Sequence, residues 1–346
     1  ITSIGIGALG GWLGGSFGSA GLPHRRQPIA WHGRFAWIAL ATLTPLIAIG
    51  GAVTSAGAGM AVPDWPGTYG SNMFLYPIGL MADPYIFLEP THRLFGTLVG
   101  LTTLVLTIAV LVRHGGWLTL AITLPLALIV VGLTLAHNTG ETAIATPTLI
   151  GVITPITLIA VGCLAWSTFR RSPGAIAASV FSLVCLQGML GALRVTEISS
   201  AYGAAHGVLA QLILCGSAIL AVTLSRGWLS YQAPPVQTRA MSGRVAAAAI
   251  VAFGALLVQL TLAALFRHTG SSHALWTHVG FSIVAVVAVA VLGFSLRGAE
   301  RYSVVGRTMN TMGGLLVVCI AVQFVLGFAA WGLLGDAGAG PSRVVM

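Results

Sequence analysis

Long apolar runs recur along the whole chain, and they constrain its fold more than any other feature. A run of about 20 apolar residues is typical of a transmembrane helix, because a helix rises about 1.5 Å per residue and the hydrocarbon core is about 30 Å thick. Helices are expected because each satisfies its own backbone hydrogen bonds in lipid. The runs predict an all-α integral membrane protein of about nine transmembrane helices, at 35–54, 92–112, 117–136, 146–168, 175–193, 203–224, 245–266, 274–296 and 309–334.

The composition agrees with lipid as the solvent. Hydrophobic residues make up 56% of the chain and charged residues 7%, whereas a soluble domain has about 25% charged residues. All 16 basic residues are arginines, and they are scattered between the apolar runs, which argues against a nucleic-acid partner. The cysteines all fall inside apolar runs without metal-ligand spacing, and we interpret them as buried structural residues: Cys163, Cys185, Cys215 and Cys319.

Loop charge predicts the orientation in the membrane. Twelve arginines lie before the first span or after the second, fourth, sixth and eighth spans, and four lie on the opposite side. Arginine is enriched in cytoplasmic loops, so this distribution predicts a cytoplasmic N-terminus. We expect a protein of the bacterial cytoplasmic (inner) membrane, surrounded by membrane lipid, whose less basic side faces the periplasm.

Sequence echoes suggest two parallel repeats and a domain division. Residues 187–191 (QGMLG) match 323–327 (QFVLG), and 259–263 (QLTLA) is a looser copy. Both units enter from the cytoplasmic side, as parallel repeats do. We divide the chain into a glycine-rich apolar segment and cytoplasmic lead-in, an N-terminal bundle, a cytoplasmic linker and a C-terminal half-bundle: 1–34, 35–225, 226–244 and 245–346. Residues 1–22 contain eight glycines and are left unassigned, and Ile1 is not expected to begin the natural product.

Three histidines are expected at a common depth near the periplasmic side. His92, His206 and His278 each lie about one turn inside a predicted span. An ionisable side chain within a span is costly and by default suggests a functional site. Two neutral imidazoles from neighbouring helices can ligate a haem iron from both sides. The alternative is that each histidine caps a helix end or hydrogen-bonds to a loop carbonyl.

Two charged residues flank the first of these histidines. Glu89 lies three residues before His92, so a helix that includes both places them on one face. The carboxylate is a candidate proton relay, or alternatively a charge that stabilises the helix N-terminus. Arg93 is a candidate partner for a haem propionate, or alternatively a snorkelling interface residue. Pro90 suits the first turn of the helix, where its missing N–H costs nothing.

Four stretches in order along the chain resemble the haem A synthase family. Residues 50–66 (GGAVTSAGAGMAVPDWP) resemble its first periplasmic loop, and the ExxHR of Glu89, His92 and Arg93 resembles its second-helix motif. Residues 186–197 and His206-Gly207 resemble its third and fourth helices. The resemblance covers roughly 30–225 strongly, apart from one insert, and 245–335 more weakly. It implies a fold of two four-helix bundles in parallel repeat.

The resemblance also implies an activity. Haem A synthases oxidise a methyl group of haem O to a formyl group, which gives haem A for terminal oxidases; successive hydroxylation and loss of water from a geminal diol are expected. By the same resemblance His92 and His206 flank the haem as axial iron ligands, Glu89 is the required acid, and His278 ligates a second haem, haem b. The implied partners are haem O synthase (protohaem farnesyltransferase) and the cytochrome oxidase assembly machinery, and a homo-oligomer is left open.

The chain departs from the family pattern in three ways. The spans within 117–168 form an extra pair, which preserves the orientation of everything after it. The chain stops at Met346, where the eighth family helix is expected, so the C-terminal haem b half-bundle is expected to be incomplete. The first periplasmic loop lacks the cysteine pair of some members. Two other function classes stay open: a non-catalytic di-haem b-type electron-transfer protein, and a transporter whose Gly- and Pro-interrupted spans line a pathway.

Overall fold

The structure is a computed structural model that describes residues 31–76, 78–138, 144–225, 236–297 and 304–336. The glycine-rich stretch 1–22 and most of the lead-in segment therefore lie outside the described residues. So do residues 226–235 of the expected linker and the last ten residues of the chain.

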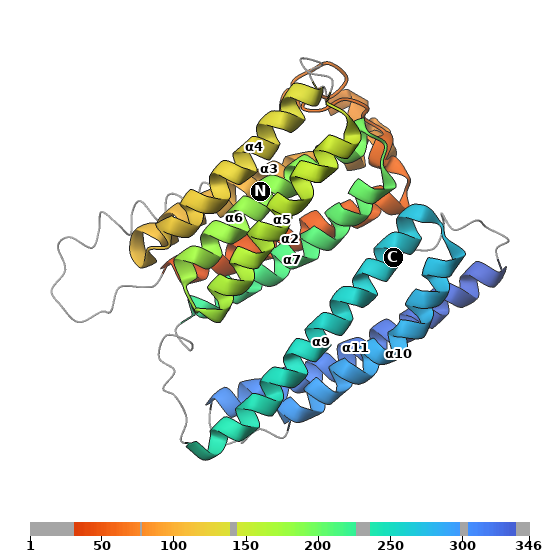
Figure 1. Cartoon of the computed structure of the whole chain (residues 1–346). Helices are drawn as coiled ribbons and strands as arrows, with labels where there is room; N and C mark the ends of the chain where they lie inside the picture. Colours follow the sequence, from red (N-terminus) through yellow and green to blue (C-terminus); the bar gives the residue numbers. More distant parts are fainter. Residues whose placement is uncertain (1–30, 77, 139–143, 226–235, 298–303, 337–346) are drawn as a thin grey trace. The chain divides into compact units, whose positions relative to one another are not determined.

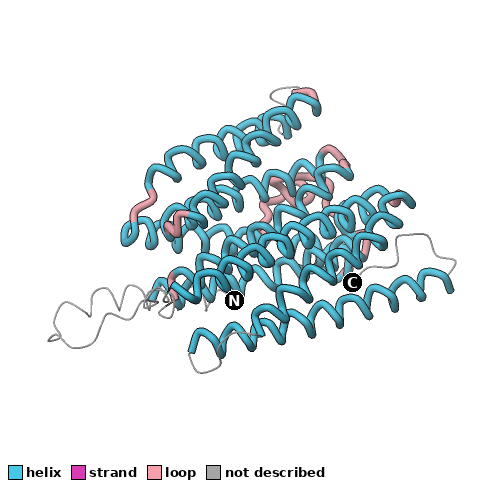
Figure 2. Tube along the Cα trace, turned by 60° about the horizontal axis from the view of Figure 1, so that its bottom comes forward, coloured by secondary structure: helices cyan, strands magenta, loops and turns pink. Residues whose placement is uncertain are grey.

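Within those ranges the structure contains nine helices that are long and apolar enough to cross a membrane. Figure 2 shows the described chain as helices joined by loops, and Figure 1 labels the helices. The predicted all-α membrane fold and each of its nine spans are confirmed. The helices are α2 (Trp31–Ser55), α3 (Pro84–His114), α4 (Trp117–Asn138), α5 (Thr146–Phe169), α6 (Pro173–Thr196), α7 (Ser200–Thr223), α9 (Val236–Thr269), α10 (Ser272–Arg297) and α11 (Val304–Asp336).

The start of α3 differs from the sequence prediction. Asp83 caps this helix, because its carboxylate accepts hydrogen bonds from the backbone N–H groups of Tyr85 (2.8 Å) and Ile86 (3.2 Å). Pro84 occupies the first helical position, where a proline is well tolerated. The prediction that Pro90 lies in the first turn was therefore wrong: Pro90 is inside the helix. The cap-and-proline pair at 83–84 starts the helix earlier than hydropathy alone indicated.

The chain divides into two compact units, which we describe separately. Unit 1 comprises residues 1–199 and 209–231, and unit 2 comprises 200–208 and 232–346. The start of α9 at Val236 lies inside the range expected to be a linker.

Helix α6 is the centre of unit 1. It packs against α3, α4 and α5. It is also the most buried of the described spans, since 61% of its most hydrophobic 18-residue stretch is buried inside the protein. Close backbone approach fixes its N-terminus: a Cβ added to Gly174 would lie 1.6 Å from the carbonyl oxygen of Gly115 in the short α3–α4 turn. Helix α2 packs against α3, to which it is joined by the loop of residues 56–83.

The extra helix pair α4 and α5 is an integral part of unit 1. Both helices pack against α6, and the buried Ser182 hydroxyl of α6 donates a 2.8 Å hydrogen bond to the Thr123 hydroxyl of α4. Interhelical hydrogen bonds of this kind contribute about 0.6 kcal/mol on average in membrane proteins. The pair is thus packed on the core helix of unit 1.

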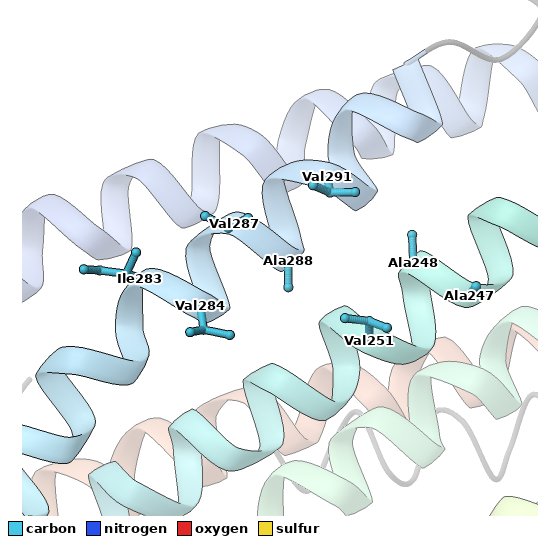
Figure 3. Close-up of a pocket in the computed structure, with 8 residues that line it drawn as sticks. All are labelled: Ala247, Ala248, Val251, Ile283, Val284, Val287, Ala288 and Val291. Atoms are coloured by element: carbon cyan, nitrogen blue, oxygen red, sulfur yellow. The ribbon is translucent and has the colours of Figure 1, made fainter.

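Unit 2 is a layer in which α10 lies between α9 and α11 and packs against both. Gly293 of α10 and Gly313 of α11 allow the closest approach, since a Cβ on Gly313 would lie 2.4 Å from the carbonyl oxygen of Gly293. Between α9 and α10 lies an apolar groove of about 530 Å³, lined by residues from 247–251 and 283–291 (Figure 3). All of its lining side chains are alanine, valine or isoleucine.

Candidate functional site

The loop of residues 56–83, between α2 and α3, organises one end of unit 1, which we call the loop end. Gly57, with φ of 70°, ends α2 in the left-handed conformation that glycine adopts without strain. A short 3-10 helix, Ala58–Met60, follows, and a second one, Ile78–Ala82, precedes α3. The site is built on the side chains that fasten this loop to α3 and α6.

Arg93 of α3 is the main anchor of the loop. Its Nη1 donates hydrogen bonds to the carbonyl oxygens of Asp64 (2.8 Å) and Gly67 (3.0 Å). Its Nη2 donates to the carbonyl oxygen of Val62 (2.9 Å) and to Oε1 of Glu89 (2.7 Å). The planar guanidinium presents several donors in a fixed geometry, which suits several acceptors at once. In the structure Arg93 is committed to the protein itself, so its suggested contact with a haem propionate stays a prediction.

Glu89 is buried at the loop end and both of its carboxylate oxygens are occupied. The residue is 3% exposed; Oε1 pairs with Arg93, and Oε2 accepts a 2.8 Å hydrogen bond from the backbone N–H of Val62. A buried charge is tolerated only when it is paired and hydrogen-bonded. The carboxylate therefore holds the loop in place, whatever chemistry it also performs.

A second arginine approaches the same carboxylate from α6. The guanidinium of Arg194 lies against Gly59, where an added Cβ would be 2.7 Å from Nη2. Arg194 also interacts electrostatically with Glu89. Glu89 thus lies in the field of two arginines from two helices. The sequence alone predicts no role for Arg194; its position in the last turn of a span, near a predicted periplasmic loop, is the signal that points to it.

The tip of the loop is a compact turn around Asp64. The Asp64 carboxylate accepts hydrogen bonds from the backbone N–H groups of Tyr69 (2.7 Å) and Gly70 (2.9 Å). The Tyr69 hydroxyl donates to the carbonyl oxygen of Ala61, and its ring stacks on that of Tyr76. Burial raises the pKa of the Tyr76 hydroxyl, and Tyr69 and Asp64 raise it further. The Tyr76 phenol therefore stays neutral under ordinary conditions.

His92 lies on α3 one turn after Glu89, and its ring packs against α2. The backbone of Leu46 hydrogen-bonds to this histidine. A Cβ added to Gly50 would lie 2.8 Å from Cε1 of the imidazole. Glycine at position 50 therefore provides the space that the ring occupies, and the expected placement of Glu89 and His92 on one helix is what the structure has.

The other two predicted iron ligands belong to unit 2. His206 lies in the 200–208 segment of α7, and its pairing with His92 stays a prediction. His278 of α10 faces α9: its Nδ1 lies 3.3 Å from the carbonyl oxygen of Gln259, whose Nε2 donates a 3.2 Å hydrogen bond to the carbonyl oxygen of His278. Donation from Nδ1–H to this carbonyl makes Nε2 the acceptor nitrogen, and Nε2 of Gln259 lies 3.5 Å from it.

Two further contacts that involve histidines were not predicted as sites. At the loop end, His137 of α4 contacts Glu197 after α6, with 2.5 Å between Nε2 and Oε1. At the opposite end of unit 1, the Nε2 atoms of His32 and His114 lie 3.3 Å apart. Partners so far apart in the chain leave no spacing signal in the sequence. Among the described residues, no three or more His, Cys, Asp or Glu side chains gather where a metal ion fits.

The apolar groove of unit 2 is separate from all of these residues. It contains no histidine and no ionisable side chain, so it suits an apolar lipid-facing surface and not a site of chemistry. No protein-family model, curated protein or solved structure matches the chain. The resemblance to haem A synthases therefore stays a prediction.

Proposed function

We propose that this protein is a haem-binding membrane oxidoreductase that oxidises a methyl group of haem O to the formyl group of haem A. The observation that carries the proposal is the buried Glu89, which is ion-paired with Arg93, interacts electrostatically with Arg194 and lies one helical turn from His92. A carboxylate and an imidazole on one helix face, at the end of a membrane span, are costly and by default functional.

The residues present fit a haem in two respects. The Nδ1–H bond of His278 to a backbone carbonyl makes Nε2 the proposed axial ligand of haem b, and haem binding would displace the Gln259 amide that lies 3.5 Å from this atom. Gly50 leaves room for the His92 ring beside α2, where His92 and His206 are the proposed ligands of the substrate haem. The bound haem iron supplies the redox chemistry of methyl oxidation.

The chain's own residues position the substrate and manage protons. Glu89 is the proposed group that accepts protons near the reacting methyl carbon. Arg93 holds the loop of residues 56–83 over this end of unit 1, which excludes water from the buried carboxylate. We place the loop end at the periplasmic face of a bacterial inner membrane, since arginine is concentrated on the other side. Haem O synthase as the source of substrate, and the oxidase assembly machinery as its destination, belong to the same proposal.

The decisive measurement is an absorption spectrum of the purified protein with pyridine haemochrome analysis. His92→Ala and His206→Ala should each abolish the low-spin haem signal of the N-terminal half, because one axial ligand is lost. Full retention of the spectrum in either variant would contradict the ligand assignment.

A substitution of Glu89 tests its proposed role as the proton acceptor. Glu89→Gln should retain haem but stop formyl formation, since an amide accepts no proton. Asp83→Asn is the matched control on the same helix, because asparagine caps a helix as well as aspartate does, and it should leave haem A output unchanged. Normal haem A output from Glu89→Gln would remove Glu89 from the mechanism.

A non-catalytic di-haem electron carrier is the second candidate, favoured by one observation. Both carboxylate oxygens of Glu89 already accept hydrogen bonds within the protein. An electron carrier would need Glu89 in this structural role, to hold the loop of residues 56–83 in place. The carrier would bind unchanged protohaem, whereas the enzyme would contain haem O or haem A. Haemochrome analysis separates the two.

A further inference from the structure

Three polar residues occupy one face at the loop end of α4. Thr134, His137 and Asn138 are spaced i, i+3 and i+4, so they lie on the same side of the helix. Thr134 is fully buried, and α4 packs against α6. The extra helix pair, to which the family resemblance assigns no role, thus brings a polar face into unit 1.

His137 forms a close pair with Glu197, which follows the last residue of α6. Nε2 and Oε1 are 2.5 Å apart, and the two side chains are 19% and 14% exposed. Two ligands that each stand about 2.0–2.2 Å from one metal ion are farther apart than this in a tetrahedral site, so the contact is a hydrogen bond. Nε2–H donates to the carboxylate, which leaves Nδ1 of His137 as an acceptor.

Among the described residues, the polar atoms beside this pair have no hydrogen-bond partner. These are Nδ1 of His137, both amide atoms of Asn138 and the hydroxyl oxygen of Thr134, all of which are buried. Buried polar atoms in proteins nearly always have a partner, either protein or ordered water. The set contains donors and acceptors, the mixture that buried water molecules satisfy with two to four bonds.

Few charged side chains of the described residues lie near the pair. Helix α6 contributes Arg194, one turn before Glu197 and in electrostatic contact with Glu89. Helix α5, which also packs against α4, has no acidic or basic side chain in Thr146–Phe169. Within the part of the chain that the structure describes, Glu197 is therefore the carboxylate that offsets a positive charge on His137.

We propose that Glu197 and His137 form a proton-accepting dyad, reached through water held at Thr134 and Asn138, that takes up protons released at the Glu89 end of unit 1. A proton adds to Nδ1 of His137 while the Nε2–H bond to Glu197 is retained. No electron is exchanged, and the carboxylate offsets the charge of the imidazolium. The proposed function supplies only the source of the protons; the dyad itself rests on the contacts above.

Nitrogen-15 NMR of the full-length protein with labelled histidine tests the dyad without any activity. His137→Gln identifies its signals by difference. We expect the Nε2–H tautomer near neutral pH and a second proton at Nδ1 on acidification, and we expect Glu197→Gln to abolish the tautomer preference. His32→Gln, which alters the histidine pair at the opposite end of unit 1, is the control and should leave the signals unchanged. An Nδ1–H tautomer, or a ring that never gains the second proton, would overturn the proposal.

Turnover tests the proton role. His137→Gln should slow formyl formation at least tenfold with unchanged haem content, consistent with the size of general acid–base effects. The double change Thr134→Val and Asn138→Leu, which removes the water-binding atoms but not the dyad, should slow it while the tautomer persists. Unchanged rates in both variants would refute proton transfer through this site. A wild-type protein that forms no haem A would refute the proposed function, while the NMR result would decide the dyad independently.

Discussion

At the scale of single residues, the loop end depends on one guanidinium. Arg93 joins three backbone carbonyl groups of the loop to the buried carboxylate of Glu89. Charge alone would not achieve this, since the four acceptors lie around a planar, rigid donor set. The geometry explains why arginine, rather than another cation, is suited to this position in α3.

Arg93→Lys is therefore expected to loosen the loop although it retains the positive charge. A lysine ammonium cannot reach all four acceptors, and an unsatisfied buried group costs about 1–3 kcal/mol. Hydrogen–deuterium exchange should increase at the amide of Val62 and in the turn around Asp64, and the thermal unfolding temperature in detergent should fall. The exposed Arg113 offers the control, since Arg113→Lys in the last turn of the same helix should change neither quantity. Equal exchange in both variants would show that the loop is held by other contacts.

At the scale of helices, the contact between α2 and α3 depends on which glycine faces the partner. Gly50 lies against the His92 ring, whereas an added Cβ on the adjacent Gly51 would meet nothing within 4 Å. Alanine normally stabilises a helix interior relative to glycine by about 1 kcal/mol. The same substitution at two neighbouring positions should therefore have opposite effects.

Gly50→Ala should displace the His92 ring and lower the free energy of unfolding, while Gly51→Ala should leave it unchanged or raise it. If His92 ligates a haem, Gly50→Ala should also alter the haem absorption spectrum and Gly51→Ala should not. Thermal unfolding and absorption spectra of the two variants provide the comparison. Indistinguishable variants would mean that the ring does not rest on α2 as the structure shows.

At the scale of the whole molecule, the nine apolar helices found in the described residues make this a membrane protein, and the arginine distribution predicts which side is cytoplasmic. Single cysteines in a background without the four native ones provide the test. Ser71→Cys should react with a membrane-impermeant maleimide added from the periplasmic side, and Ser172→Cys should react only after the membrane is opened. The reverse pattern would invert the topology without altering the helices.

The spans could be predicted from the sequence because hydropathy over one span is a local property. Helix α5 was predicted at 146–168 and is found at Thr146–Phe169. The helix start at Asp83-Pro84 was missed because a cap and a following proline, rather than hydropathy, determine it. Glu89 and His92 are found on one helix, as their spacing of three residues predicted, while their roles in a site stay predictions.

The sequence by itself determined the solvent, the number of spans and the residues costly enough in lipid to suggest a function, because each of these depends on the energy of transferring a short segment out of water. Only the tertiary structure decided what those residues touch. Val62 on Glu89, Arg194 on Gly59 and Glu197 on His137 are contacts between distant segments. Such contacts depend on how helices pack, and no periodicity or spacing along the chain records them.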